Sequence, residues 1–204
     1  MLPSYFVYIG STISFLGGVS YVIDVLKGKN KPNLVSWFLW TLAPMIAFAS
    51  QIRQGVGPVA VMTFTAGFNP LLVVLASFIS KKSLWKITYF DIACGALSLL
   101  GLVLWLSTDI PILALIFSIL ADGLAALPTI IKSYKAPQTE SSAAFVTSII
   151  GAVLALLTIK TWTFQNYGFS LYILIVCIVM ASLIGFKIGP RIKHFRIAKK
   201  ATLL

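Results

Sequence analysis

Apolar residues fill seven long stretches of the chain, and short polar segments separate each stretch from the next. All seven stretches fall within the roughly 17 to 25 residues that an α-helix needs to cross a bilayer. Hydrocarbon offers no hydrogen bonds to an exposed backbone, so runs this long and uniform are predicted to be helices rather than barrel strands. The predicted spans are residues 5–26, 34–52, 58–79, 88–106, 110–134, 143–159 and 167–186.

The composition also indicates an all-α polytopic membrane protein. Of the 204 residues, 59% are hydrophobic and 10% are charged, and the mean hydropathy is +0.98. A water-soluble domain with this composition would lack the polar side chains to cover its surface. In a soluble chain the net charge of +11 would suggest nucleic acid as a partner. Here the basic residues gather in short connections and in the C-terminal tail, so we expect the lipid bilayer as partner and no nucleic acid.

The positions of lysine and arginine predict the orientation. With the N-terminus outside, all but two of the 16 basic residues fall on the cytoplasmic side, and only Arg53 and Lys160 fall outside. An excess of Lys and Arg marks cytoplasmic connections. The prediction is a multi-pass protein of the cell membrane with seven transmembrane helices, the N-terminus outside and the C-terminus cytoplasmic. In a Gram-negative bacterium this membrane would be the inner one.

The chain contains an internal repeat at an offset of 105 residues. The aligned pairs are Gly18 with Gly123, Lys27 with Lys132, Pro32 with Pro137, Asn33 with Gln138 and Ser36 with Ser141. Both copies cover the cytoplasmic end of one predicted helix, a basic turn and the start of the next helix. We therefore expect a 3+1+3 parallel repeat: three-helix units in residues 1–83 and 110–189, a linker helix in 84–109, and a basic cytoplasmic tail in 190–204. A substrate site is expected near the midplane, between the two units.

This topology, with the segments "KPNLVSWFLW" and "LPTIIKS" at the cytoplasmic turns, resembles the PQ-loop and SWEET superfamily. In that superfamily a Pro-Gln dipeptide lies within a helix, shortly before the basic turn. Pro128 and Thr129 occupy this position here, whereas the literal dipeptide, Pro137 with Gln138, falls in the loop. The first unit has no proline at the corresponding place. The resemblance implies an integral membrane carrier for a small molecule that works by alternating access.

The resemblance also implies one polar contact for the substrate. Sugar-carrying SWEET proteins use asparagines on the third helix of each unit, and Asn69 in the stretch 58–79 matches one of them. The stretch 167–186 contains no asparagine, so a symmetric pair of asparagines is not expected.

Asp122 is the residue that points most directly to chemistry, because it lies in the middle of the stretch 110–134. On insertion scales an aspartate at the bilayer centre costs about 2.5 to 3.5 kcal/mol. Facing a polar cavity would lower that cost. The carboxyl could then take up and release a proton as the cavity alternates, or balance the charge of a cationic substrate. The alternative is a neutral Asp122 that donates a hydrogen bond to a neighbouring helix.

Four other residues join Asp122 and Asn69 in the predicted substrate or proton pathway. Pro128 removes one helix hydrogen bond and allows a bend, and Thr129 follows it. Gly17 aligns with Asp122 in the repeat, where it could line the path or simply let two helices pack closely. Trp40 could form a cavity wall or face lipid.

Three further acidic residues are assigned more local roles. Asp24 and Asp91 are secondary candidates near the cytoplasmic ends of their helices, where we expect ion pairing with Lys27 and Lys86 or solvation. Glu140 precedes the stretch 143–159 and is expected to favour the N-terminus of that helix.

The sequence shows no catalytic constellation, and we expect no enzyme activity, cofactor or metal site. His194, the single histidine, lies in the tail, and the two cysteines lie in different apolar stretches without CxxC spacing. The leading hypothesis is therefore a carrier, with proton coupling through Asp122 as one mode of action. The alternative is a non-transporting membrane receptor or binding protein of the same fold. The substrate and the oligomeric state, including a homo-oligomer, stay open.

Overall fold

The computed structural model describes residues 2–3, 5–53, 59–80 and 85–201, and these residues form helices and no β-strand. The helices are α1 (Phe6–Leu26), α2 (Leu34–Arg53), α3 (Val59–Ser80), α4 (Tyr89–Leu106), α5 (Pro111–Lys135), α6 (Ala143–Thr158), α7 (Phe164–Gly185) and α8 (Ile188–Ala201), with a short 3-10 helix, η1 (Pro137–Thr139), after α5. All seven predicted stretches are confirmed as helices, with described ends within three residues of those expected. The expected start of the third stretch at residue 58, together with Lys81 and Lys82, lies outside the described residues.

The length and hydropathy of the helices identify a multi-pass membrane protein. Five of them, α1, α3, α4, α5 and α7, are long and apolar enough to cross a bilayer. The apolar parts of α2 and α6 are shorter, at Leu34–Ala49 and Ala143–Thr158. Many large apolar side chains point outward, among them Leu75, Phe78 and Ile79 of α3. Lipid can cover such side chains, so they carry no penalty in a bilayer.

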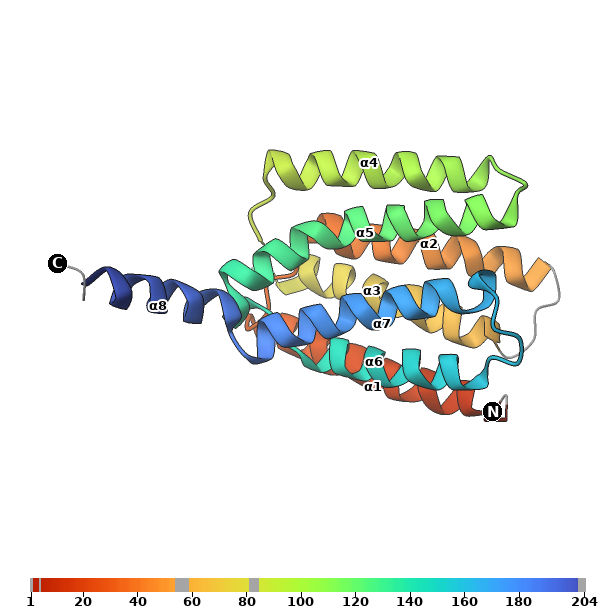
Figure 1. Cartoon of the computed structure of the whole chain (residues 1–204), viewed down its shortest axis with the longest axis horizontal. Helices are drawn as coiled ribbons and strands as arrows, with labels where there is room; N and C mark the ends of the chain where they lie inside the picture. Colours follow the sequence, from red (N-terminus) through yellow and green to blue (C-terminus); the bar gives the residue numbers. More distant parts are fainter. Residues whose placement is uncertain (1, 4, 54–58, 81–84, 202–204) are drawn as a thin grey trace.

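Consecutive helices run back and forth along one axis, and two groups of three pack in the same way (Figure 1). In the first group, α3 packs against both α1 and α2. In the second, α7 packs against both α5 and α6. The groups meet where α1 packs on α6 and α2 packs on α5. The third helix of each group therefore has the same neighbours within its own group.

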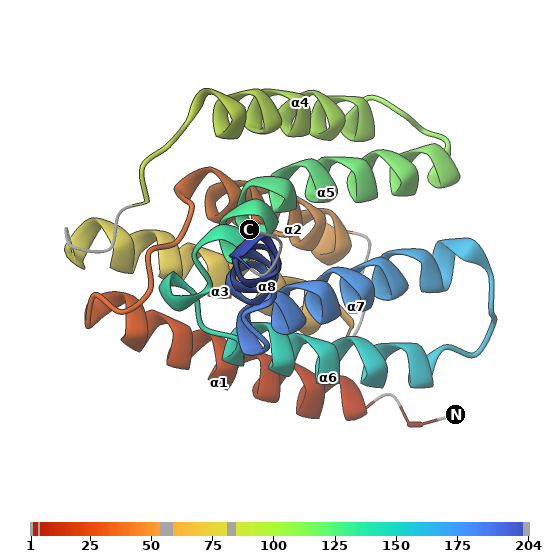
Figure 2. The same cartoon turned by 60° about the vertical axis from the view of Figure 1, so that its left-hand side comes forward.

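Helix α4 lies at the outside of the bundle, against α5 and, less extensively, α2 (Figure 2). The Ser98 hydroxyl donates a 2.6 Å hydrogen bond to the carbonyl oxygen of Ala121 in α5. A β-carbon added to Gly101 would lie 3.1 Å from the β-carbon of Ala121, so the two helices approach closely at this point. The start of α4 is fixed locally, because Thr88 and Asp91 form a capping box there.

The end of the bundle from which α8 projects is called the α8 end below (Figure 1). A buried apolar cluster lies near it, formed by residues that include Tyr21, Val25, Trp37, Met180 and Ile184. The connections 27–33 and 136–142 lie at this end as well. The interior next to them is also rich in buried polar side chains, namely Asn30, Asn33, Ser36, Thr129, Lys132, Ser133 and Glu140.

The basic tail expected in 190–204 forms the helix α8 over most of its length. Lys187, with a φ of 49°, turns the chain between α7 and α8. Gly189 then lies directly on the carbonyl group of Tyr134 at the end of α5, where a β-carbon would overlap that carbonyl. The base of α8 is therefore packed on the bundle, whereas the rest of α8 extends away from it (Figure 1).

Candidate functional site

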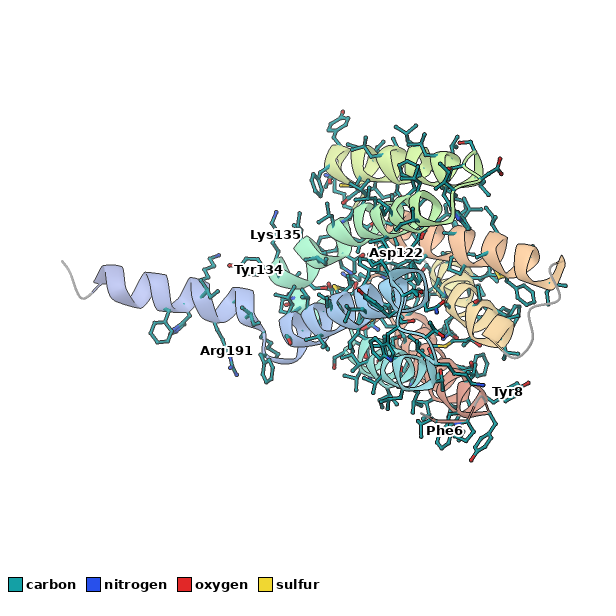
Figure 3. All side chains as sticks on the ribbon, turned by 45° about the vertical axis from the view of Figure 1, so that its right-hand side comes forward. Phe6, Tyr8, Asp122, Tyr134, Lys135 and Arg191 are labelled. Atoms are coloured by element: carbon teal, nitrogen blue, oxygen red, sulfur yellow. The ribbon has the colours of Figure 1, made fainter. Side chains whose placement is uncertain are left out.

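Asp122 is held in the interior of the bundle by groups from two other helices. It is the twelfth of the 25 residues of α5. The hydroxyl of Tyr172, in α7, donates a 2.7 Å hydrogen bond to Asp122 Oδ2. The indole of Trp40, in α2, interacts with the same carboxylate. Figure 3 shows Asp122 between the helices, far from Phe6 and Tyr8 at one end of the molecule and from Arg191 at the other.

The surroundings of Asp122 extend to α6 through Cys177. Cys177 of α7 is 7% exposed and lies close enough to interact with both Asp122 and the side chain of Ser148 of α6. The helices around this carboxylate therefore come from both three-helix groups. Among the described residues, no lysine, arginine or histidine forms an ion pair with Asp122. The carboxylate thus has aromatic and hydroxyl neighbours and, within the described part of the chain, no fixed counter-ion.

Asn69 lies in a different part of the interior, between α3 and α1. Its Nδ2 donates a 2.9 Å hydrogen bond to the carbonyl oxygen of Ser14. Its Oδ1 is buried and has no hydrogen-bond partner among the described residues. The side chain also lies against Gly18, where a β-carbon would overlap it. Asn69 is 9% exposed, so it belongs to the interior of the first group.

Gly17 and Gly18 let α1 approach two helices at once. A β-carbon on Gly17 would overlap the Thr147 side chain of α6, and one on Gly18 would overlap Asn69 of α3. Gly123, the repeat equivalent of Gly18, is less crowded, because its β-carbon would lie 3.6 Å from the nearest atom, the Tyr172 hydroxyl oxygen. Gly17 therefore serves close packing between the two groups, one of the two roles left open by the sequence.

Pro128 and Thr129 are both buried within α5, and the helix continues through the proline. Thr129 is fully buried, and its hydroxyl has no hydrogen-bond partner among the described residues. Pro44 in α2 and Pro70 in α3 also lie inside continuous helices. A proline has no N–H for the carbonyl one turn earlier, so each of these helices lacks one backbone hydrogen bond.

The two secondary candidates take part in local contacts that differ from the expected ones. Asp24 forms an ion pair with Lys29, at 3.7 Å, rather than with Lys27. Asp91 accepts hydrogen bonds from the backbone N–H and the hydroxyl of Thr88, at 2.7 and 2.9 Å. It is 4% exposed. The expected pairing of Asp91 with Lys86 is therefore replaced by a helix cap.

Glu140 is the acidic residue whose surroundings the sequence interpretation missed. It precedes α6 as expected, but its side chain is buried and forms an ion pair with Lys132; the side chains of Glu140 and Lys132 are 0% and 1% exposed. The Tyr21 hydroxyl donates a hydrogen bond to Glu140 Oε2. The Lys132 ammonium also donates to the Lys31 carbonyl oxygen and lies 5.1 Å from the centre of the Trp85 ring. A lysine inside an apolar helix was the available signal, because such a charge needs a partner when it is buried.

Three aromatic rings connect Asp122 with Glu140. Trp40, beside Asp122, meets the ring of Trp37 edge-on with a centroid distance of 5.4 Å. The Trp37 ring in turn lies 4.6 Å from that of Tyr21, which donates to Glu140. The interior of the bundle thus has an unbroken series of contacts from its middle to the α8 end.

No family model, curated protein or solved structure matches the chain. The arrangement of its own residues is therefore the basis for the function considered next.

Proposed function

We propose that the protein is a membrane carrier for a small polar or cationic molecule, working by alternating access with Asp122 as its charge-bearing site. The observation that carries this proposal is the position of Asp122. The carboxylate lies halfway along α5, receives a hydrogen bond from Tyr172 of α7 and interacts with Trp40 of α2. It therefore lies where both three-helix groups meet, and its neighbours can change if the groups move relative to each other.

The packing of the helices supports a parallel repeat of two units around this site. In each group the third helix packs against the first and the second, and the groups meet through α1 with α6 and α2 with α5. The first helix of each unit thus packs on the second helix of the other unit. Two equivalent units related by a two-fold axis produce this pattern of contacts. Together with the outlying α4, this supports the 3+1+3 arrangement and the proposed relationship to PQ-loop and SWEET carriers. Carriers built from such repeats bind their substrates between the repeats.

The proposed topology has seven spans, with the α8 end in the cytoplasm. Lys27, Lys29, Lys31, Lys86, Lys132, Lys135, Lys187, Arg191 and Lys193 belong to elements at that end, whereas Lys160 follows α6 at the other end. At about 1.5 Å per residue, the 16 residues of α6 extend about 24 Å, so α6 requires a thinner stretch of bilayer than α7 does.

The absence of a fixed counter-ion among the described residues favours a mobile cation at Asp122, either a proton or a positively charged substrate. A permanent negative charge at this depth would be costly, by about 2.5 to 3.5 kcal/mol on insertion scales. The Tyr172 hydroxyl stabilises the charged form by donating a hydrogen bond to it. A group in such surroundings can alternate between its charged and neutralised states during transport.

Uptake into proteoliposomes tests this proposal. A ligand is first chosen by its thermal stabilisation of the purified protein, and its uptake is then measured with and without a pH gradient. Asp122→Asn preserves the size of the side chain and removes its charge. We expect uptake to fall at least tenfold and the response to the pH gradient to disappear. Asp109→Asn is the matched control, because Asp109 is exposed in the connection between α4 and α5.

Two results would reject the proposal in different ways. Unchanged pH dependence in Asp122→Asn would exclude this carboxyl as the proton site. Saturable ligand binding without any uptake by the wild-type protein would favour the receptor alternative. Labelling of Cys177 separates the same two possibilities without a ligand: a carrier exposes it to an impermeant maleimide from both sides of the membrane, and a receptor from one.

A further inference from the structure

Three hydrogen bonds join the first three-helix unit to the second at the α8 end. The Lys31 backbone N–H donates to the Thr139 carbonyl oxygen, with a distance of 2.9 Å between the nitrogen and the oxygen. The Tyr21 hydroxyl donates to Glu140, and the Lys132 ammonium donates to the Lys31 carbonyl oxygen. These contacts connect α1 and the segment after it with the end of α5 and the segment after that.

The ion pair beside these contacts belongs entirely to the second unit. Lys132 and Glu140 are eight residues apart in the chain and neutralise each other in the interior. Separating a buried pair is costly because it leaves uncompensated charges. Moving the two units apart breaks the three hydrogen bonds between them but leaves the ion pair together. The α8 end can therefore open without leaving a buried charge unpaired.

The first unit has no equivalent of this pair. At the offset of 105 residues Lys132 corresponds to Lys27, which is exposed, and Glu140 corresponds to Val35. The pair is therefore a feature of one side of the boundary, and its ammonium and carboxylate reach across to Lys31 and Tyr21 on the other side. The ion pair of the first unit, Asp24 with Lys29, is instead partly exposed and stays within its own turn.

The series of rings brings this end of the bundle into contact with the candidate substrate site. Tyr21 touches both Glu140 and Trp37, and Trp37 touches Trp40 beside Asp122. Trp37 and Tyr21 are 4% and 0% exposed, so a shift of one ring has to be accommodated by the next. A change at Asp122 can reach the α8 end through these contacts.

We propose that Tyr21, Lys132 and Glu140, together with the contact of Lys31 with Thr139, form the gate that closes the α8 end of the path to Asp122. The inference rests on the proposed carrier function. In the closed state the three hydrogen bonds hold the two units together. In the open state α5 and its following segment move away from α1 with the Lys132–Glu140 pair intact, and water reaches Asp122 and Cys177.

A reversible disulfide across the gate is the direct test. The backbone hydrogen bond between Lys31 and Thr139 joins their main chains directly, and a disulfide requires α-carbons about 4.4 to 6.8 Å apart. The gate uses only backbone atoms of these two residues, so Lys31→Cys with Thr139→Cys preserves its hydrogen bonds. The variant also carries Cys94→Ala, which leaves Cys177 as the reporter beside Asp122. An impermeant maleimide is applied to right-side-out and inverted vesicles, and labelling of the Cys177 peptide is followed by mass spectrometry.

Oxidation of the pair should slow labelling of Cys177 from the α8 side at least tenfold, and reduction should restore it. A separate Phe195→Cys variant identifies the vesicles that present the α8 side, because Phe195 is 79% exposed on α8. Leu2→Cys with Leu157→Cys is the matched control, because Leu2 N donates to Leu157 O at 3.0 Å at the opposite end. Its oxidation should leave labelling from the α8 side unchanged.

Tyr21→Phe checks the gate without a disulfide, because it removes one of the three hydrogen bonds and should speed labelling from the α8 side. Two results would overturn the inference: a rate of Cys177 labelling that does not change when the disulfide between positions 31 and 139 forms, or no labelling from the α8 side even in the reduced protein. If the disulfide controls labelling but the protein carries no ligand across the membrane, the gate proposal stands and the carrier function is rejected.

Discussion

Asn69 of α3 packs directly on Gly18 of α1, and its amide nitrogen donates a 2.9 Å hydrogen bond to the carbonyl oxygen of Ser14 one turn earlier. This contact joins the first and third helices of the first unit at a polar point in an apolar interface. It requires a glycine, because a β-carbon at position 18 would overlap the Asn69 side chain.

Gly18→Ala should therefore destabilise the protein. Overpacking of a well-packed interior typically costs about 1 to 3 kcal/mol, and displacement of Asn69 also breaks its bond to Ser14. The midpoint of thermal unfolding in detergent measures the effect. Gly123→Ala at the equivalent position meets only an ordinary contact at 3.6 Å. Alanine there should stabilise α5 by up to about 0.5 to 1 kcal/mol, so equal shifts in the two variants would contradict this account.

The bond between Tyr172 and Asp122 should appear as a coupling energy. Tyr172→Phe removes the donor, Asp122→Asn removes the charged acceptor, and the double variant removes both. A hydrogen bond to a charged group contributes about 1.5 to 3 kcal/mol, whereas bonds between membrane helices average about 0.6 kcal/mol. We expect a coupling of about 1 kcal/mol from unfolding measurements on the four proteins. A value near zero would mean that the two side chains do not interact in the folded protein.

The Lys132–Glu140 pair should be much more sensitive to single substitutions than the Asp24–Lys29 pair. Glu140→Gln leaves a buried ammonium without a counter-charge, which typically costs about 3 to 5 kcal/mol. Adding Lys132→Met should recover part of that loss, because no charge is then left unpaired. Lys29→Met should cost at most about 1 kcal/mol, since Lys29 is 67% exposed. Unfolding free energies of these variants decide the comparison, and an additive double variant would argue against direct pairing.

Asp91 should matter for stability and not for transport. Asp91→Ala removes the acceptor for the backbone N–H and hydroxyl of Thr88, and the loss of a helix cap costs about 1 kcal/mol. Thermal unfolding should therefore shift, while uptake and its pH dependence remain those of the wild type. A loss of uptake at unchanged stability would instead indicate that Asp91 belongs to the substrate or proton pathway.

The helices were predictable from the sequence because a bilayer imposes both their length and their apolar character. The stretches 34–52 and 110–134 correspond closely to α2 and α5. Helix α8 was not predicted, because "IGPRIKHFRIAKK" is basic and lacks a long apolar run. Its start also depends on Lys187 adopting a φ of 49°, and on the packing of Gly189 against Tyr134.

Asp122 and Glu140 differ in how visible they are in the sequence. Asp122 stands alone in an apolar stretch, so its position among the helices follows from the pattern. Glu140 lies in a polar connection, where solvation is the ordinary expectation. Only the fold brings it to Tyr21, which is 119 residues away in the chain, so its environment depends on long-range packing that local sequence does not encode.

The missing backbone hydrogen bond at Pro128 divides α5 into two parts with different attachments. The part before the proline carries Asp122 and is tied to α4 by the Ser98 hydroxyl at Ala121. The part after it carries Lys132 and is attached to the connections at the α8 end. A small rotation at Pro128 can thus displace the lysine while the aspartate stays in place. In the proposed carrier, α4 would thus be an anchor and α5 a lever with its pivot between the two charged residues.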